Sequence, residues 1–381
     1  MTKKILILSG GHFAAVYAAS LIGALKLLDS SLNIKALCDV HLREVGMDLL
    51  GADSAVADES SGIIEKVSSE TEVFSVFKKY LNEETYDCLV MIDFDDSKFR
   101  YVKEASKRGI KLVQYNNPPT VELSNKFLTR TSAAVDRALL TFPHLAPLYE
   151  SGGVNAEFVG HPLVDLMGID MTRDEAKYAV GYDDRYERPI AILPSDFPAG
   201  SDEEMADMFR LIVTAAAEGA AASIRKVRIL IPEAERYDRD LLSEIVKICP
   251  ARIKCIDGQR KEALRASHTA VVTSGAATLE AMMVDTPPIL VQQSSKFKSA
   301  LSSLMGKKGY LSVPNIISGK RLTPELLNKQ ANHQNVSEEV CGLVEDTVAM
   351  QLMVKEMIEI KNSLGSPGTI KKAAEAVYRL L

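Results

Sequence analysis

The chain has 381 residues, of which 46% are hydrophobic and 25% are charged, and its formal net charge is −6. This length predicts two domains, and the composition is typical of a globular protein with enough apolar residues for two cores. The negative charge excludes a large nucleic-acid interface and provides no general attraction to anionic membranes.

Two features of the chain predict a soluble protein of the cytoplasm. The first apolar run, residues 5–8, ends at a glycine pair too early for a signal peptide, and no run approaches the roughly 20 apolar residues of a membrane span. The five cysteines are scattered and lack the spacing of metal ligands, so we expect free thiols in a reducing compartment.

Short apolar runs alternate with helix-like segments in the first 142 residues. The first expected helix spans residues 13–28, and the expected strands are residues 5–9, 34–38, 88–92, 112–115 and 139–142. Strands separated by helices predict a mainly parallel sheet with helices on both faces.

A stretch that contains Pro and Gly, residues 160–168, follows and predicts a hinge between domains. The alternation then restarts, with helices expected near 203–218 and 238–248, and strands at 190–193, 227–231, 254–256, from 271 and at 289–291. The last forty or so residues are helix-like, with a break at 365–368. We therefore predict two doubly wound α/β domains whose strands point their carboxyl ends at a ligand cleft.

Residues 271–283 contain the most informative motif. An apolar strand runs into small residues at Ser274, Gly275 and Ala276, and then into a helical pattern that carries Glu280. Small residues at such a junction let the phosphates of a ligand reach backbone N–H groups at the helix start, and a carboxylate in the first turns can accept hydrogen bonds from ribose hydroxyls. The alternative is a tightly packed turn in which Glu280 only favours the helix start.

Four segments occur in an informative order: residues 160–165 (GHPLVD), 273–280 (TSGAATLE), 310–316 (YLSVPNI) and 325–327 (ELL). In this order they resemble the lipid-A-disaccharide synthase family, and the resemblance covers nearly the whole chain. It implies a B-type glycosyltransferase (GT-B) fold with two Rossmann-like domains. An acceptor domain would span residues 1–165, with the final helix within 366–381 packed back onto it, and a nucleotide-sugar domain would span residues 166–365.

The resemblance also implies an activity and a set of donor-binding residues. The reaction would transfer diacylglucosamine from UDP to diacylglucosamine 1-phosphate, releasing UDP and forming a β-1,6 disaccharide. The residues implied to bind the UDP-sugar are Ser195, Ser274, Gly275, Ala276 and Thr278 beside the diphosphate, Glu280 at the ribose and Asn315 near the donor.

Asp93 is the candidate general base. It follows the expected strand 88–92 directly, and Asp96 lies three residues further on, as two acids do in the family. A carboxylate at this end of a strand faces the expected cleft and can take the proton of the acceptor hydroxyl. The alternatives are a solvated acidic loop, or an Asp96 that caps the next helix.

His12 is a second candidate at the first strand–helix turn. It follows Gly10 and Gly11, where backbone N–H groups and an imidazole could hold an acceptor phosphate or act as a base. The alternative is a histidine at a helix start without a role. Asn116, after the strand 112–115, is a candidate acceptor-binding residue.

Several departures from the family pattern leave the substrate open, and two of them concern the diphosphate and the membrane. The family's Gly-Ser-Arg turn, which binds the UDP diphosphate, is replaced by residues 195–200, where Asp196 would repel a diphosphate and Pro198 offers no N–H. The family's membrane-contacting segment corresponds to residues 55–80, which are too polar for an interfacial helix. The candidate replacements for the missing arginine are Arg225, Lys226 and Lys296.

Three interpretations therefore stand. The first is a lipid-A-disaccharide synthase-like hexosyltransferase with a UDP-sugar donor, a glycolipid acceptor and a peripheral membrane contact. The second is a non-catalytic relative that binds a ligand or partner, and the third is a transferase for a different, less lipidic UDP-sugar. None of the three requires a metal or another cofactor, and none involves nucleic acid.

Overall fold

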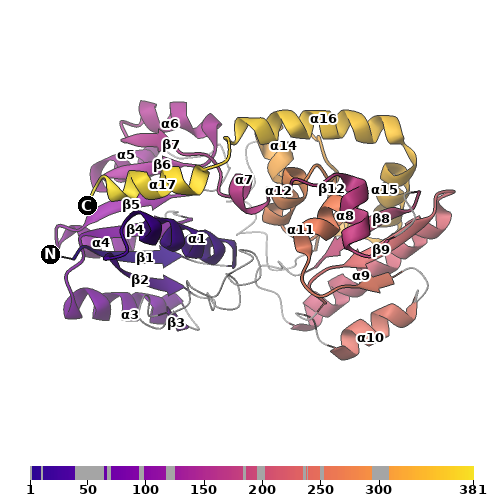
Figure 1. Cartoon of the computed structure of the whole chain (residues 1–381), viewed down its shortest axis with the longest axis horizontal. Helices are drawn as coiled ribbons and strands as arrows, with labels where there is room; N and C mark the ends of the chain where they lie inside the picture. The colour runs from indigo at the N-terminus through magenta and orange to yellow at the C-terminus, as the bar shows by residue number, and fades with distance from the viewer. Residues whose placement is uncertain are drawn as a thin grey trace. The chain divides into compact units, whose positions relative to one another are not determined.

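The chain forms two compact units, which are shown in the computed structural model of Figure 1. The structure describes residues 2–9, 12–38, 64–66, 70–93, 98–116, 125–182, 186–194, 202–234, 237, 239–248, 253–293 and 309–381. Unit 1 comprises Met1–Leu166 and Ser363–Leu381, and unit 2 comprises Met167–Asn362. The chain therefore leaves unit 1 once and returns to it at its C-terminal end.

Unit 1 is built on a parallel sheet with the strand order β3-β2-β1-β4-β5-β6-β7 in its described residues. The central strands bury side chains on both faces: residues 5–8 of β1 are at most 3% exposed, and residues 88–92 of β4 are fully buried. A continuous apolar run is typical of a strand covered on both faces. The strands are β1 (Lys4–Ser9), β2 (Asn33–Cys38), β3 (Ile64–Lys66), β4 (Cys88–Ile92), β5 (Lys111–Tyr115), β6 (Arg137–Leu140) and β7 (Ala156–Phe158).

The helices of unit 1 cover this sheet, and the last helix of the chain, α17, packs against the first, α1 (Figure 1). Arg379, just after α17, forms an ion pair with Glu157 of β7, which also fixes the end of the chain on unit 1. The helices and 3-10 turns are α1 (His12–Leu28), α3 (Glu70–Glu83), α4 (Phe99–Ser106), α5 (Asn125–Ala134), η3 (Pro143–Leu145), α6 (Ala146–Ser151), α7 (Leu163–Leu166) and α17 (Thr369–Tyr378).

Unit 2 repeats the architecture with the strand order β10-β9-β8-β11-β12-β13, again all parallel in its described residues. Its core lies under α9 and α15, which pack closely: a Cβ added at Gly219 of α9 would meet the Ser337 carbonyl oxygen of α15 at 2.5 Å. The strands are β8 (Arg188–Leu193), β9 (Val227–Ile231), β10 (Ile253–Cys255), β11 (Thr269–Val272), β12 (Pro288–Gln292) and β13 (Glu325–Leu327). The helices and 3-10 turns are α8 (Arg173–Ala179), α9 (Asp202–Ala222), α10 (Arg239–Ile248), α11 (Arg260–Ala266), α12 (Gly275–Met283), α14 (Val313–Ser318), η5 (Asn328–Gln330), α15 (His333–Glu345) and α16 (Thr347–Ser363).

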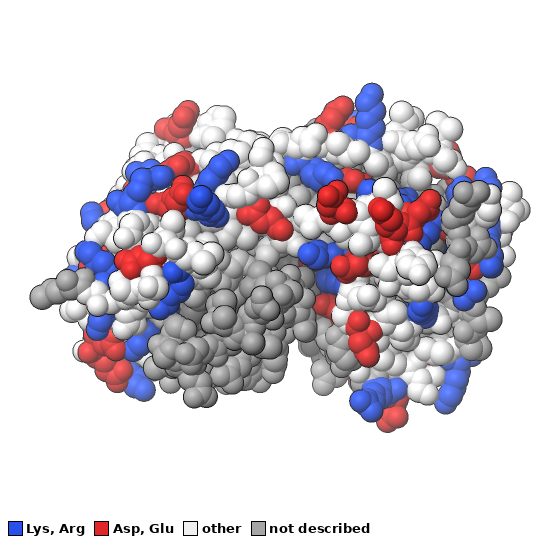
Figure 2. Space-filling model, viewed as in Figure 1, with Lys and Arg blue, Asp and Glu red and all other residues white. Residues whose placement is uncertain are grey.

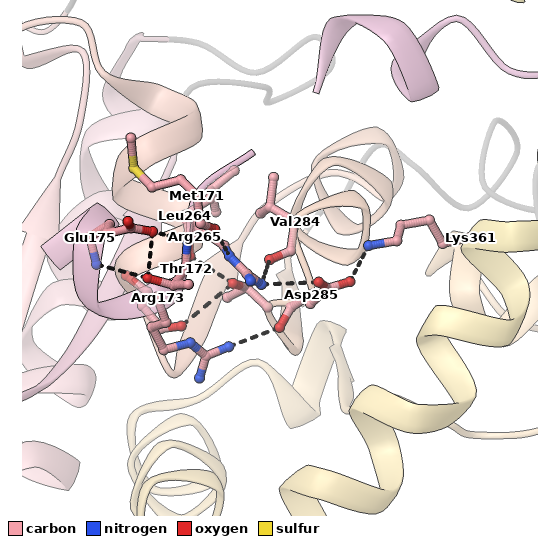
Figure 3. Close-up of polar contacts among 11 residues, drawn as sticks. Met171, Thr172, Arg173, Glu175, Leu264, Arg265, Val284, Asp285 and Lys361 are labelled. Atoms are coloured by element: carbon pink, nitrogen blue, oxygen red, sulfur yellow. Dashed lines mark hydrogen bonds and ion pairs between the residues drawn. The ribbon is translucent and has the colours of Figure 1, made fainter. Parts of the chain in front are cut away.

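Asp285 ties the segments that enter and leave unit 2 to its body (Figure 3). Its carboxylate forms ion pairs with Arg265 of α11 and with Lys361 near the end of α16. Its backbone carbonyl accepts a hydrogen bond from Arg173 at the start of α8, at 2.9 Å. Arg265 also donates to the carbonyl of Met171, so the first residues of unit 2 and its last helix are joined to the same point.

A similar junction closes unit 1, where the motif at residues 160–165 meets the break before α17. Gly160 has a φ of +89°, and a Cβ there would lie 2.5 Å from the Thr369 side chain, so only glycine fits. Asp165 accepts hydrogen bonds from the backbone N–H groups of Gly368 at 2.6 Å and Ile370 at 2.8 Å. Burial lowers the pKa of His161 to about 3, which keeps this packed imidazole neutral. This motif therefore has a structural task.

We expect Asp165→Ala to lower the free energy of unfolding by about 1–2 kcal/mol, because Asp165 supplies the cap that Gly368, the N-cap residue of α17, cannot. Urea unfolding monitored by circular dichroism measures this change. Asp170→Ala removes an exposed carboxylate five residues away and is the matched control. Equal stability of the two variants would contradict the capping role.

Candidate functional site

Each sheet has one point at which the strand order reverses. In unit 1 it lies between β1 and β4, and in unit 2 between β8 and β11, because the chain builds outward from β1 and from β8 in both directions. In open α/β sheets ligands bind outside the carboxyl ends of the strands at this switch point. The candidate base Asp93 follows β4 in the first unit, and the candidate phosphate-binding residues from Ser274 onward follow β11 in the second. Asp93 and the start of α12 therefore lie beside the switch points of their sheets.

Asp93, the candidate base, directly follows β4 and is half-buried. Its φ of +55° is in the left-handed region, which aspartate and asparagine tolerate better than most residues. The Asp93 N–H donates to the carbonyls of Tyr115 and Asn116. The Lys98 ammonium donates to the Asp93 carbonyl at 2.6 Å. These contacts hold the backbone in a turn that continues no helix or strand.

Asn116 connects the Asp93 carboxylate to the next strand. The Asn116 amide donates to Asp93 Oδ1 at 2.6 Å, and its oxygen accepts from the Thr141 hydroxyl, also at 2.6 Å. Asn116 has a φ of +53° and is 7% exposed. The acceptor-binding role of Asn116 stays a prediction, and these contacts show that its side chain also orients the Asp93 carboxylate. Burial raises the pKa of the neighbouring Tyr115 phenol far above its ordinary value, with the charges of Asp165 and Asp93 adding to the effect.

Several predicted residues of these sites fall outside the described residues. His12 begins α1, as expected for the turn after β1, but its side chain is not described. Gly10, Gly11, Asp96 and Ser195 lie entirely outside the described residues. The roles predicted for these five residues therefore stay predictions.

In unit 2 the strand β11 leads into α12 as the sequence predicts. Ser274 is the N-cap residue, and its hydroxyl accepts a hydrogen bond from the Ala277 N–H at 3.1 Å. Gly275 and Ala276 are the first two residues of the helix, and their N–H groups lie at the N-terminal end, where the helix dipole favours an anion. Thr273 is fully buried beside them, and its hydroxyl has no hydrogen-bond partner among the described residues. The helix start therefore presents polar groups suited to a phosphate.

The segment that follows Tyr310 packs directly on this helix start. A Cβ added at Gly275 would lie 2.6 Å from the Leu311 carbonyl oxygen, and the Val313 N–H donates to the Thr278 hydroxyl at 3.1 Å. The close approach of Leu311 therefore requires glycine at position 275, independently of any ligand. The two segments that resemble the family, residues 273–280 and 310–316, therefore pack against each other.

Asn315 holds that segment in place. It is fully buried, and its side chain donates to Glu325 Oε1 and to the Thr323 carbonyl while accepting from the N–H groups of Leu322 and Thr323. Glu325 in turn accepts from the Ser312 N–H at 2.8 Å, and its burial raises the pKa of its carboxyl. Asn315 was predicted to lie near the donor, and these contacts show how it shapes the segment against the start of α12.

We expect Gly275→Ala to lower the free energy of unfolding by about 1–3 kcal/mol, because the new methyl group would overlap the Leu311 carbonyl, which is backbone. Thermal unfolding monitored by circular dichroism measures the change. Gly342→Ala is the matched control: Gly342 lies inside α15 with nothing within 4 Å of the added Cβ, so alanine should stabilise by about 0.5–1 kcal/mol. Two variants that shift stability alike would rule out the close approach.

Glu280, the predicted ribose ligand, is 1% exposed and lies one turn into α12. Its Oε2 accepts hydrogen bonds from Arg260 Nε at 3.1 Å and Nη2 at 2.6 Å. Arg260, itself 5% exposed, donates through Nη1 to Glu233 at 2.8 Å. Sequence reasoning missed Arg260 and Glu233, because neither lies in a motif and their elements, α11 and the end of β9, are 20 and 47 residues from Glu280.

The structure corrects two candidates for replacing the missing arginine. Arg225 and Lys226 come directly before β9, so they lie at the amino ends of the parallel strands, opposite the start of α12. Lys226 also forms an ion pair with Glu187, which directly precedes β8. Neither side chain can reach a diphosphate at α12. Lys296 lies outside the described residues.

The expected polarity of the segment 55–80 agrees with the part of it that the structure describes. In helix α3, Phe77 is fully buried; its ring stacks on that of Phe74 and meets the ring of Tyr101 edge to face. No helix among the described residues is long and apolar enough to cross a membrane. On the face drawn in Figure 2, basic and acidic side chains are interspersed. Surface ion pairs among the described residues include that of Lys3 with Asp87.

Comparison with solved structures defines the class of protein. The structure of UDP-GlcNAc 2-epimerase from Neisseria meningitidis bound to UDP-GlcNAc superposes with a TM-score of 0.66 at 15% identity, covering 99% of this chain and 100% of that chain. TcCGT1 in complex with UDP superposes with a TM-score of 0.63 at 10% identity, covering 100% of both chains. Two parallel Rossmann-like units of this kind are the GT-B fold, as predicted.

The sequence comparisons then give the family. The family model described as lipid-A-disaccharide synthetase matches residues 5–377, so the chain belongs to this family. A relative from Syntrophus aciditrophicus, named lipid-A-disaccharide synthase, is 28% identical over 386 residues, covering 100% of this chain and 98% of the relative. The chain is therefore a divergent hexosyltransferase, and the interpretation as a non-catalytic relative is not needed.

Proposed function

We propose that this enzyme transfers diacylglucosamine from UDP to diacylglucosamine 1-phosphate, releasing UDP and forming a β-1,6 disaccharide. The observation that carries the proposal is the coincidence of both candidate sites with the switch points of their sheets. Membership of the lipid-A-disaccharide synthetase family supports the choice of substrates. The free thiols Cys88, Cys255 and Cys341 fit an enzyme that works in the cytoplasm.

In this proposal unit 2 binds the donor. The diphosphate lies at the start of α12, where the N–H groups of Gly275 and Ala276 and the buried Thr273 hydroxyl can donate to its oxygens. Glu280 accepts hydrogen bonds from the ribose hydroxyls. Dipole and N–H groups stabilise the charge that builds on UDP as the sugar leaves, which is the main electrostatic demand of the reaction.

Unit 1 supplies the base. Asp93 removes the proton from the acceptor hydroxyl as this oxygen attacks the sugar carbon that bears UDP. Asn116 orients the carboxylate through its 2.6 Å hydrogen bond, and Thr141 orients Asn116. A base held in one orientation reduces the entropy that the transition state must otherwise lose.

The test is a direct assay with UDP-diacylglucosamine and diacylglucosamine 1-phosphate, in which UDP release and the mass of the lipid product are measured. The expected result is a disaccharide 1-phosphate formed in equal amount to UDP. A less lipidic donor is the second candidate, favoured by the buried apolar side chains of α3. Turnover of UDP-N-acetylglucosamine in place of the diacylated donor would select that candidate and contradict the first.

A further inference from the structure

Arg260, the first residue of α11 in unit 2, carries a buried charge beside the buried Glu280 of α12. Its side chain is 5% exposed, and its guanidinium contacts two carboxylates that are 1% and 4% exposed, those of Glu280 and Glu233. A buried ion pair often contributes little to stability compared with apolar packing, because both charges lose their hydration. The arrangement therefore calls for a reason other than stability.

The geometry of the contacts supplies one. Arg260 Nε and Nη2 both donate to the same oxygen of Glu280, Oε2, so the planar guanidinium fixes the direction of that carboxylate. Nη1 donates to Glu233 at 2.8 Å, which prevents the guanidinium from turning about its own bonds. A carboxylate that must meet two ribose hydroxyls needs such a fixed direction.

The backbone around Arg260 is also held in an unusual form. Gly258, Gln259 and Glu233 have φ values of +57°, +51° and +52°, and the Glu233 N–H donates to the Gly258 carbonyl at 3.2 Å. Left-handed backbone at non-glycine residues costs free energy and persists only where the surrounding structure imposes it. Here it brings Glu233, two residues after β9, within hydrogen-bond distance of Arg260, the first residue of α11.

We infer that Arg260 is a positioning residue for nucleoside recognition: with Glu233 as its second partner, it directs the Glu280 carboxylate toward the ribose hydroxyls of the donor. The inference rests on the proposed function, because it assumes that Glu280 meets the ribose. It extends that function by making the specificity for a ribonucleotide depend on three residues, Glu233, Arg260 and Glu280, that are far apart in the sequence.

The experiment compares UDP with 2′,3′-dideoxyuridine diphosphate, which lacks both hydroxyls. Calorimetric titration of the full chain gives the ratio of the two dissociation constants. We expect the unaltered protein to prefer UDP roughly 5–150-fold, the range of one or two charge-assisted hydrogen bonds. In Arg260→Lys, which keeps the charge and loses the planar fork, this preference should fall to less than threefold while the dideoxy compound binds as before.

Glu233→Gln is the second variant, and it remains informative if Arg260→Lys does not fold. This change weakens only the contact made by Arg260 Nη1. The logarithm of the ratio of the two dissociation constants should therefore fall by about half. Equal weakening of both nucleotides in either variant, or an unchanged preference in Glu233→Gln, would overturn the inference and leave a structural ion pair. Failure of the unaltered protein to bind UDP at all would overturn the proposed function itself.

Discussion

Asp93→Asn should lower kcat by about 10²–10⁴ while leaving the affinity for UDP unchanged. Asparagine keeps the shape of the side chain and tolerates the φ of +55°, and its oxygen can still accept the hydrogen bond from Asn116. The change therefore removes the basic carboxylate with little disturbance of the turn. Initial rates at saturating donor and acceptor measure kcat, and a separate UDP titration measures donor binding.

Asp87→Asn is the matched control for this experiment. Asp87 lies at the amino end of β4, where it pairs with Lys3 and accepts from the Lys4 N–H, whereas Asp93 follows the carboxyl end of the same strand. We expect its kcat to stay within about twofold of the unaltered enzyme, since surface pairs contribute roughly 0–1 kcal/mol. An Asp93→Asn enzyme with full turnover, or one that loses UDP affinity in proportion to turnover, would exclude Asp93 as the base.

Glu280→Gln should raise the KM for the donor and the inhibition constant of UDP by roughly 5–150-fold, which corresponds to about 1–3 kcal/mol. Glutamine is isosteric and keeps one acceptor oxygen, but it loses the charge that strengthens hydrogen bonds from the ribose hydroxyls. Glutamine is preferable to alanine here, because Glu280 also pairs with the buried Arg260, and truncation would open a cavity beside that charge. Steady-state kinetics with UDP as product inhibitor measure both constants.

Glu187→Gln controls for the loss of a buried, paired carboxylate. Glu187 is 2% exposed and pairs with Lys226 and Arg228, but it lies before β8, at the amino edge of the same sheet. We expect Glu187→Gln to lower the free energy of unfolding as Glu280→Gln does, and to leave the donor KM and the inhibition constant of UDP unchanged. A similar rise in the donor KM in the two variants would show that the effect of Glu280→Gln comes from folding and not from the ribose.

The strands were predictable where apolar runs are long. Residues 88–92 and 227–231 were expected as strands and are β4 and β9, because a run of apolar residues, interrupted in β9 only by Arg228, fits a sheet covered on both faces. Three short strands, β3, β7 and β13, were not predicted, since each has only three residues, carries a charged side chain and lies at a sheet edge. β6 begins two residues before the expected start, because the backbone of Arg137 pairs with that of Val113 in β5.

The site was predictable only as far as contiguous motifs reach. The start of α12 follows from small residues after an apolar strand, and Asp93 follows from its place at a strand end. Contacts between distant segments could not be predicted. Neither the carbonyl of Leu311 against Gly275 nor the pairing of Arg260 with Glu280 leaves a periodic or spaced signal in one sequence.

The most direct test of the account is a calorimetric titration of the unaltered full chain with UDP. The account predicts one saturable binding event per chain at micromolar to submillimolar UDP, despite Asp196 and Pro198 in the turn where the family has Gly-Ser-Arg. Such binding would place a working nucleotide site on this divergent sequence. The absence of binding up to millimolar UDP would contradict the donor site at α12 and the transferase mechanism built on it.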